Sequence, residues 1–188
     1  MGVMLRRGFK AEAEAYACEF RKELGLRASH PLNMFKLAQC LDIPMLGLRE
    51  LAQEIKDASY LLLTTSVKSP FSAVTLYQGS YRSIVYNDFH APARQQSDLA
   101  HELAHVILGH SPSQLTNESG GRHYNQELEQ EAACLSGVLL VPKAAAIAVV
   151  ASRKPIEQAA SEFNISVQMM SMRLNQSGAK KIMARSGY

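Results

Sequence analysis

The stretch DLAHELAHVILGH, residues 98–110, decides the fold, because it has the apolar spacing of a helix and carries three chemically active side chains. Residues four apart lie on the same face of an α-helix, so His101 and His105 can direct both imidazoles to one centre. Zinc accepts such nitrogens, and a catalytic zinc site leaves a fourth position open to water. Glu102 lies about 100° further round the helix, badly placed to ligate but able to reach that water as a base.

The plainer interpretation of this stretch is a core helix whose two histidines have no chemical role. The zinc interpretation is favoured because the segment is expected to be helical on independent grounds. Pro92 fits its first turn, and Gly109 and Pro112 would end it. Residues 106–108 are apolar and would bury its other side. The stretch therefore predicts two zinc ligands and a general base.

Two histidines cannot close a catalytic zinc site, so a third ligand must come from elsewhere in the chain. His110 continues the helix at a poor angle and is expected to cap its end or face solvent. His123 could ligate only if the Gly-rich loop of residues 111–125 folds over the site. The downstream candidates are His110, Glu118, His123, Glu127, Glu129 and Glu131.

The helix expected over residues 126–140 is a better source, because a second helix packed on the first presents a rigid carboxylate. Glu129 lies beside its core-facing stripe and one turn before two alanines, which allow close approach of the helices. Glu127 and Glu131 lie further round and are expected to face solvent. The spacing therefore favours Glu129. The stripe itself comprises Leu128, Ala132, Leu135 and Leu139.

The order of segments predicts an α+β fold, with helices, then a small three-stranded antiparallel sheet, then helices again. The last two strands are joined by a turn at Gly79 and form a hairpin. We expect one compact domain, with a body over residues 1–152 and a C-terminal helical pair over residues 153–188. Helices are expected over residues 9–25, 29–44, 126–140 and 155–178 (the last in two pieces), and strands over 59–66, 71–78 and 81–88.

Composition narrows the class of protein. With 188 residues, 47% hydrophobic and 20% charged, the chain can bury a real core. A formal net charge of only +3 argues against nucleic acid or a membrane as the main partner. The N-terminus lacks the apolar region of a signal peptide, so a cytoplasmic protein is expected. Cys18, Cys40 and Cys134 include no CxxC pair and are expected to be small buried hydrophobes.

The paired motifs HELAHVILGH and ELEQEAACLSGVLLVP, at residues 101–110 and 127–142, resemble those of the ImmA/IrrE family of zinc metallopeptidases. The resemblance extends over most of residues 9–175, and it places the family's ligand glutamate on Glu129. It implies a zincin-like domain in which His101, His105 and Glu129 bind Zn²⁺ and Glu102 activates water. It also implies a protein substrate, typically a helix-turn-helix transcriptional repressor whose cleavage relieves repression.

The chain departs from the family pattern at Ala133, where the family has Asn or Asp. The change removes a side chain of the kind that orients a metal ligand. A zinc-binding regulator without proteolytic activity is therefore the first alternative function.

A second electrophile often shares the developing oxyanion in zinc peptidases. His123 and Tyr124 are the candidates, because their loop lies between the two helices that carry the ligands. The alternative is a loop tip without a role.

The C-terminal helices offer a second alternative function, a DNA-binding regulator that uses residues 155–181. Ser166 fits the N-cap of a DNA-recognition helix that would present Arg173 to DNA, and Lys180 and Lys181 follow that helix. The competing interpretation is that these helices cover the core, and the scattered charge favours it.

Overall fold

Three strands form one sheet in the order β1–β3–β2 in the computed structural model, which describes residues 5–54, 71–110 and 125–185. β2 (Ala73–Gln78) and β3 (Tyr81–Tyr86) form the predicted antiparallel hairpin. β1 (Met45–Gly47) pairs with β3 in parallel, so the sheet is mixed, and the expectation of an antiparallel sheet is wrong in this part. Parallel pairing is possible because a long connection, which includes α3, separates β1 from β3. The strand expected at 59–66 lies outside the described residues.

The helices confirm the predicted α+β class, with helices before and after the sheet. The second helix begins later than expected, because the side chain of Asn33 caps it by accepting from the backbone N–H groups of Phe35 and Lys36. The helices of the described ranges are α1 (Phe9–Glu23), α2 (Met34–Cys40), α3 (Leu48–Glu54), α5 (Pro92–Ile107), α7 (Gln126–Leu140), α8 (Lys143–Ser152), α9 (Ile156–Glu162), α10 (Val167–Gln176) and α11 (Ala179–Arg185).

Within those ranges, no single helix is long and apolar enough to cross a membrane. The pair α7 and α8 passes the same test of length and composition only when taken together, with a bend of 45° between them.

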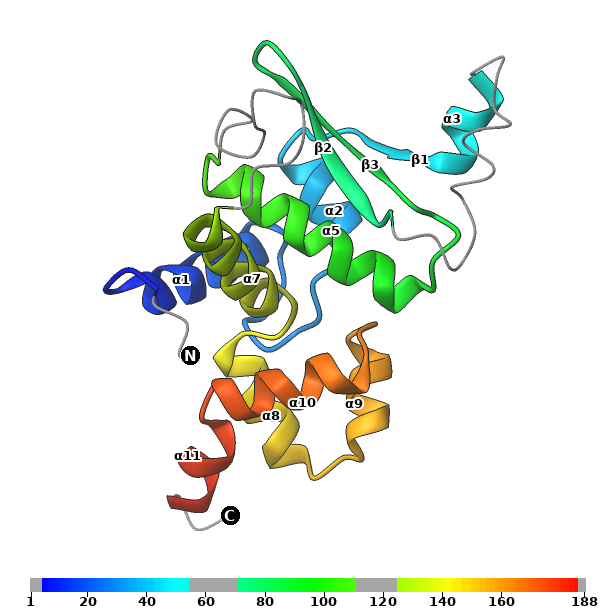
Figure 1. The fold of residues 1–188 in the computed structure, drawn as a ribbon. Helices are drawn as coiled ribbons and strands as arrows, with labels where there is room; N and C mark the ends of the chain where they lie inside the picture. Colours follow the sequence, from blue (N-terminus) through cyan, green and yellow to red (C-terminus); the bar gives the residue numbers. More distant parts are fainter. Residues whose placement is uncertain (1–4, 55–70, 111–124, 186–188) are drawn as a thin grey trace.

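α5 is the central helix, with the sheet on one side and α7 on the other (Figure 1). Its apolar face is fully buried, as the spacing around the histidines predicts. Two of the buried residues are alanines, and Ala132 of α7 is buried as completely, so the two helices can approach closely. The fully buried apolar residues of α5 are Leu99, Ala100, Leu103 and Ala104.

Two buried arginines hold the C-terminal end of α7. Arg21 of α1 donates from Nη2 to the carbonyl oxygen of Leu139 at 2.8 Å, and Arg173 of α10 donates from Nε to that of Val141 at 3.0 Å. The last carbonyls of a helix have no partner within it, so these bonds satisfy groups that would otherwise be buried without one. Burial lowers the pKa of Arg21 to about 10, which leaves the side chain charged at neutral pH. The end of α7 is thereby tied to α1 and α10.

The C-terminal helices pack against the rest of the fold. Ser166 caps α10 as expected, since its hydroxyl accepts from the backbone N–H of Met169. Arg173, which the DNA-binding alternative would present to DNA, is only 4% exposed, and that part of the alternative is wrong. The reason is its bond to α7. The division of the chain at residue 152 stays a prediction.

The cysteines are less buried than expected. Cys18 and Cys40 are exposed, and Cys134 is partly buried. Ala17 faces the core from α1, so its neighbour Cys18 is turned outward by the helical period. The expectation that these residues are small buried hydrophobes is wrong for Cys18 and Cys40.

Replacing Arg21 with Met tests the anchoring of α7. We expect Arg21→Met to lower the free energy of unfolding by about 2–4 kcal/mol, because the carbonyls at the end of α7 lose their donor. Lys22→Met is the matched control, since Lys22 is the exposed neighbour and its loss should change little. Urea unfolding of both variants measures the difference. Equal stabilities would contradict the role given to Arg21.

Candidate metal centre

Three side chains from two helices meet in one cluster. Nε2 of His101 lies 3.1 Å from Nε2 of His105 and 3.2 Å from Oε2 of Glu129, and the remaining distance, from His105 to Glu129, is 3.7 Å. They form a group of potential ligands whose donor atoms all lie within 4.8 Å of one another. The structure therefore brings together the two histidines and the glutamate that the sequence selects.

The shape of this triangle fits a tetrahedral metal ion. With metal–ligand distances of about 2.0–2.1 Å, tetrahedral geometry sets neighbouring donor atoms about 3.3–3.4 Å apart. The observed separations lie on both sides of that value. Donor atoms with lone pairs this close repel one another unless a proton or a cation lies between them. The donor set thus fits a divalent metal ion bound by three protein ligands.

The exposure of the three side chains differs. The side chain of His105 is 1% exposed, that of Glu129 is 15% exposed, and that of His101 is 30% exposed. The cluster therefore has a buried side at His105 and a side open to solvent at His101.

α7 delivers Glu129 from its first turn. Asn125 caps this helix, with its side-chain oxygen accepting from the backbone N–H groups of Glu127 and Leu128. A carboxylate in the first turn also lies in the favourable field of the helix N-terminus. The N-terminal turn of α7 is thus fixed by its cap, and its far end by the buried arginines.

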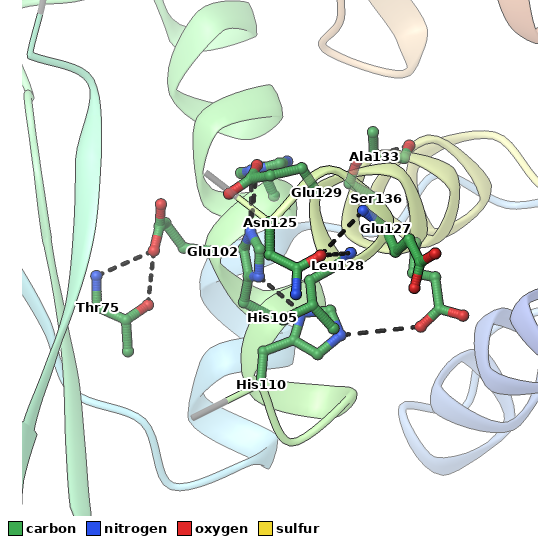
Figure 2. A network of polar contacts seen from close by, with 12 residues as sticks. Thr75, Glu102, His105, His110, Asn125, Glu127, Leu128, Glu129, Ala133 and Ser136 are labelled. Atoms are coloured by element: carbon green, nitrogen blue, oxygen red, sulfur yellow. Dashed lines mark hydrogen bonds and ion pairs between the residues drawn. The ribbon is translucent and has the colours of Figure 1, made fainter. Parts of the chain in front are cut away.

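Glu102 points to the sheet and not into the triangle. Its Oε2 accepts two hydrogen bonds from Thr75 of β2, one from the backbone N–H at 3.0 Å and one from the hydroxyl at 2.7 Å. Figure 2 shows Glu102 reaching toward Thr75. Both bonds end on Oε2, so Oε1 takes no part in the contact with Thr75. The side chain, 5% exposed, is therefore held beside the cluster in one orientation.

The turn after α5 brings His110 back onto the helix. Gly109 adopts a left-handed φ of +68°, and its N–H donates to the carbonyl of Val106, while the N–H of His110 donates to the carbonyl of His105. This pair of bonds is the Schellman motif, in which the second residue past the helix cap contacts the third residue before it. Here those two residues are His110 and His105, and their Nδ1 atoms lie 2.8 Å apart (Figure 2).

His110 is therefore a buried neighbour of His105. Its backbone N–H caps the end of the helix, as one of the two expectations had it, and the other expectation, that it faces solvent, is wrong. Its residue exposure is 5%. Burial lowers the pKa of the His110 imidazole, although the negative charge of Glu131 acts in the opposite direction. The hydroxyl of Tyr77 on β2 donates to the backbone carbonyl of His110 at 3.0 Å. Helix, turn and strand thus all fix the position of this residue.

Glu131 is also less exposed than expected. The side chain is 16% exposed, lies 3.9 Å from Nε2 of His110, and accepts from Nε of Arg6 at 2.9 Å. It faces the buried histidine because His110 folds back toward α7. Glu127 is exposed, as expected.

The two histidines of the cluster have different partners. Nδ1 of His105 bonds to His110, whereas no side chain in the described ranges bonds to Nδ1 of His101. Ala133, where the resembling family has Asn or Asp, is exposed and lies one turn after Glu129. Its methyl group can bond to neither histidine. The catalytic candidates His123 and Tyr124, together with Glu118, lie outside the described residues.

Two contacts of the cluster were missed by the sequence analysis. The glycine after the last turn of α5 was recognised as a helix stop, and the contact of a Schellman motif would have pointed to His110. Thr75 had no signal near Glu102 in the sequence, because the contact joins residues 27 apart through the packing of β2 on α5.

A helix with the HExxH pattern whose histidines meet a glutamate from a second helix is the arrangement of one class of metallopeptidases. The chain matches the peptidase M78 family, described as an IrrE N-terminal-like domain, over residues 56–175. That is more than half of its length, and the chain belongs to this family of peptidases. The resemblance to ImmA/IrrE proteins is thereby confirmed. A search of curated proteins found no match.

Gly109 can be tested directly, because the turn it forms sets the position of His110. We expect Gly109→Ala to cost about 1–2 kcal/mol of stability, since an L-residue is strained at this left-handed φ. An added Cβ would meet no atom of the described residues within 4 Å, so the expected cost is backbone strain. Gly109→Asn should lose less, because Asn tolerates this conformation. Urea unfolding of the three proteins checks this, and an Ala variant as stable as wild type would contradict it.

Proposed function

We propose that this protein is a zinc-dependent endopeptidase that hydrolyses peptide bonds of another protein. The observation that carries the proposal is the triangle of His101, His105 and Glu129, with Glu102 fixed next to it. Membership of a peptidase family supports the same reaction class. Zinc is favoured because two imidazole nitrogens and one carboxylate oxygen form one of its usual catalytic ligand sets.

When bound, zinc lowers the pKa of a coordinated water and polarises the scissile carbonyl. The chain supplies the remaining chemistry. Glu102 takes the proton from the attacking water and later delivers it to the leaving amine nitrogen. Thr75 holds Oε2 of that carboxylate through two donors, which orients Oε1 for the proton transfer. His123 and Tyr124 are the proposed donors to the oxyanion.

The proposed substrate is a helix-turn-helix transcriptional repressor inside the cell, whose cleavage relieves repression. The likeness of the paired motifs to ImmA/IrrE proteins supports this. A DNA-binding role has less support, because the buried Arg173 cannot contact DNA. A zinc-binding regulator without peptidase activity remains the competing function, since Ala133 stands at a position where the family has a polar side chain.

Zinc binding is the first test. We expect wild type to bind one zinc ion per chain and to unfold at a higher temperature when zinc is in excess. At a free zinc concentration 100 times the Kd, binding should add about 2.7 kcal/mol to the free energy of unfolding. His105→Ala should lose both effects, because only two of the three protein ligands would remain. Glu127→Ala is the control, since Glu127 is exposed on the same helix. Metal analysis and thermal unfolding provide the measurements. Zinc retained in full by His105→Ala would refute the proposed site.

Substitution of Glu102 separates the peptidase from the regulator. We expect Glu102→Gln to keep zinc but to lower hydrolysis by about 10²–10⁴-fold, because the amide cannot accept the proton. Glu127→Gln is the matched control. New protein N-termini, compared between cells that express wild type and each variant, identify cleaved substrates. Cleavage that survives Glu102→Gln would favour a different enzyme, and repression relieved without any cleavage would favour the regulator.

A further inference from the structure

On the buried side of the cluster, His105 contacts His110, a histidine that is not one of the three candidate ligands. Nδ1 of His105 and Nδ1 of His110 lie 2.8 Å apart, which is a hydrogen-bond distance between nitrogens. One proton at most can lie between them, so one ring donates and the other accepts. The direction of this bond determines the tautomer of both rings.

The metal site determines which ring donates. Nε2 of His105 is the atom that faces His101 and Glu129, and a neutral imidazole that ligates through Nε2 carries its proton on Nδ1. His105 is then the donor and His110 the acceptor. His110 in turn carries its own proton on Nε2, which lies 3.9 Å from Oε2 of Glu131. That distance is too long for a hydrogen bond and indicates an attractive contact between charge and dipole.

We propose that His110 is a positioning residue for the metal centre: its Nδ1 accepts the proton of His105 Nδ1 and so holds the His105 ring with the Nε2 lone pair directed at the metal. The inference rests on the proposed zinc site and adds a group that touches neither zinc nor substrate. Glu131 supports it by favouring the proton on Nε2 of His110.

Burial explains why the site needs this partner. The side chain of His105 is 1% exposed and that of His110 is 5% exposed, so bulk water cannot serve their inner nitrogens. An unpaired nitrogen there would carry the cost of a buried polar group without a hydrogen bond. His110 is fixed in turn by the Gly109 turn and by the hydroxyl of Tyr77. The chain of contacts weakens beyond Glu131, because Arg6 is 51% exposed and an exposed ion pair contributes little.

Two variants of nearly equal shape separate positioning from packing. In His110→Asn, the side-chain oxygen can occupy the place of Nδ1 and accept from His105. His110→Leu has the same branching without an acceptor. The zinc Kd of each protein, measured by competition with a chromophoric chelator, is the readout, and it requires no substrate. Urea unfolding without metal records any loss of the fold.

We expect His110→Leu to weaken zinc binding by about 10–100-fold, the usual effect of losing such an outer partner, and His110→Asn to retain most of the affinity. A packing role predicts the reverse order, because Leu suits a buried site better than Asn does. That order, or a Leu variant that binds zinc like wild type, would overturn the inference and leave the proposed zinc site intact. A wild-type chain that binds no zinc would overturn both.

A measurement on wild type keeps the inference testable even if His110→Leu fails to fold. In the zinc-loaded protein labelled with ¹⁵N at histidine, we expect His105 to carry its proton on Nδ1 and His110 on Nε2. We also expect a scalar coupling between the two Nδ1 nuclei across the hydrogen bond. A proton on Nδ1 of His110 would refute the proposed direction of the bond.

Discussion

The close contact between α5 and α7 is the constraint on which the candidate site depends. His101 and His105 lie on one helix and Glu129 on the other, and no local geometry brings them together. Alanines lie fully buried on both helices, and such small side chains allow a close approach. α7 is fixed at both ends, by its Asn125 cap and by the buried arginines. A shift of α7 by a fraction of a helical turn would remove Glu129 from the triangle.

Features with a local cause could be predicted from the sequence, and those with a distant cause could not. The spacing of apolar residues gave α5 and α7, and the need for a third ligand selected Glu129. The parallel pairing of β1 was missed because three residues are too few to show alternation. Arg21 was missed because a basic residue late in a helix is normally solvated. Its burial depends on the carbonyls of α7, more than a hundred residues away.

β2 shows how the site overrides the ordinary pattern of a strand. Its inner face carries Thr75 and Tyr77, which donate to Glu102 and to the carbonyl of His110, whereas its outer face exposes Val74 and Leu76. Alternation alone would turn the apolar residues inward, because one face of a strand normally covers the core. The inversion follows from two buried acceptors that face β2, the carboxylate of Glu102 and the carbonyl of His110. Buried acceptors require hydrogen-bond donors, and apolar side chains cannot supply them. Functional sites are where such local rules are expected to fail.

The two histidines of the cluster differ in which groups can bond to the ring nitrogen that faces away from the cluster. His105 is almost fully buried, so only protein can bond to its inner nitrogen, and the turn at Gly109 supplies His110 for that purpose. His101 is 30% exposed, so water can reach its ring and bond to it at little cost. Ala133, one turn after Glu129, is exposed. Loss of a polar side chain there leaves a solvated histidine to water, whereas an equivalent loss at His110 would remove the bond to the inner nitrogen of a buried one. The support of this candidate metal centre is therefore concentrated on its buried side.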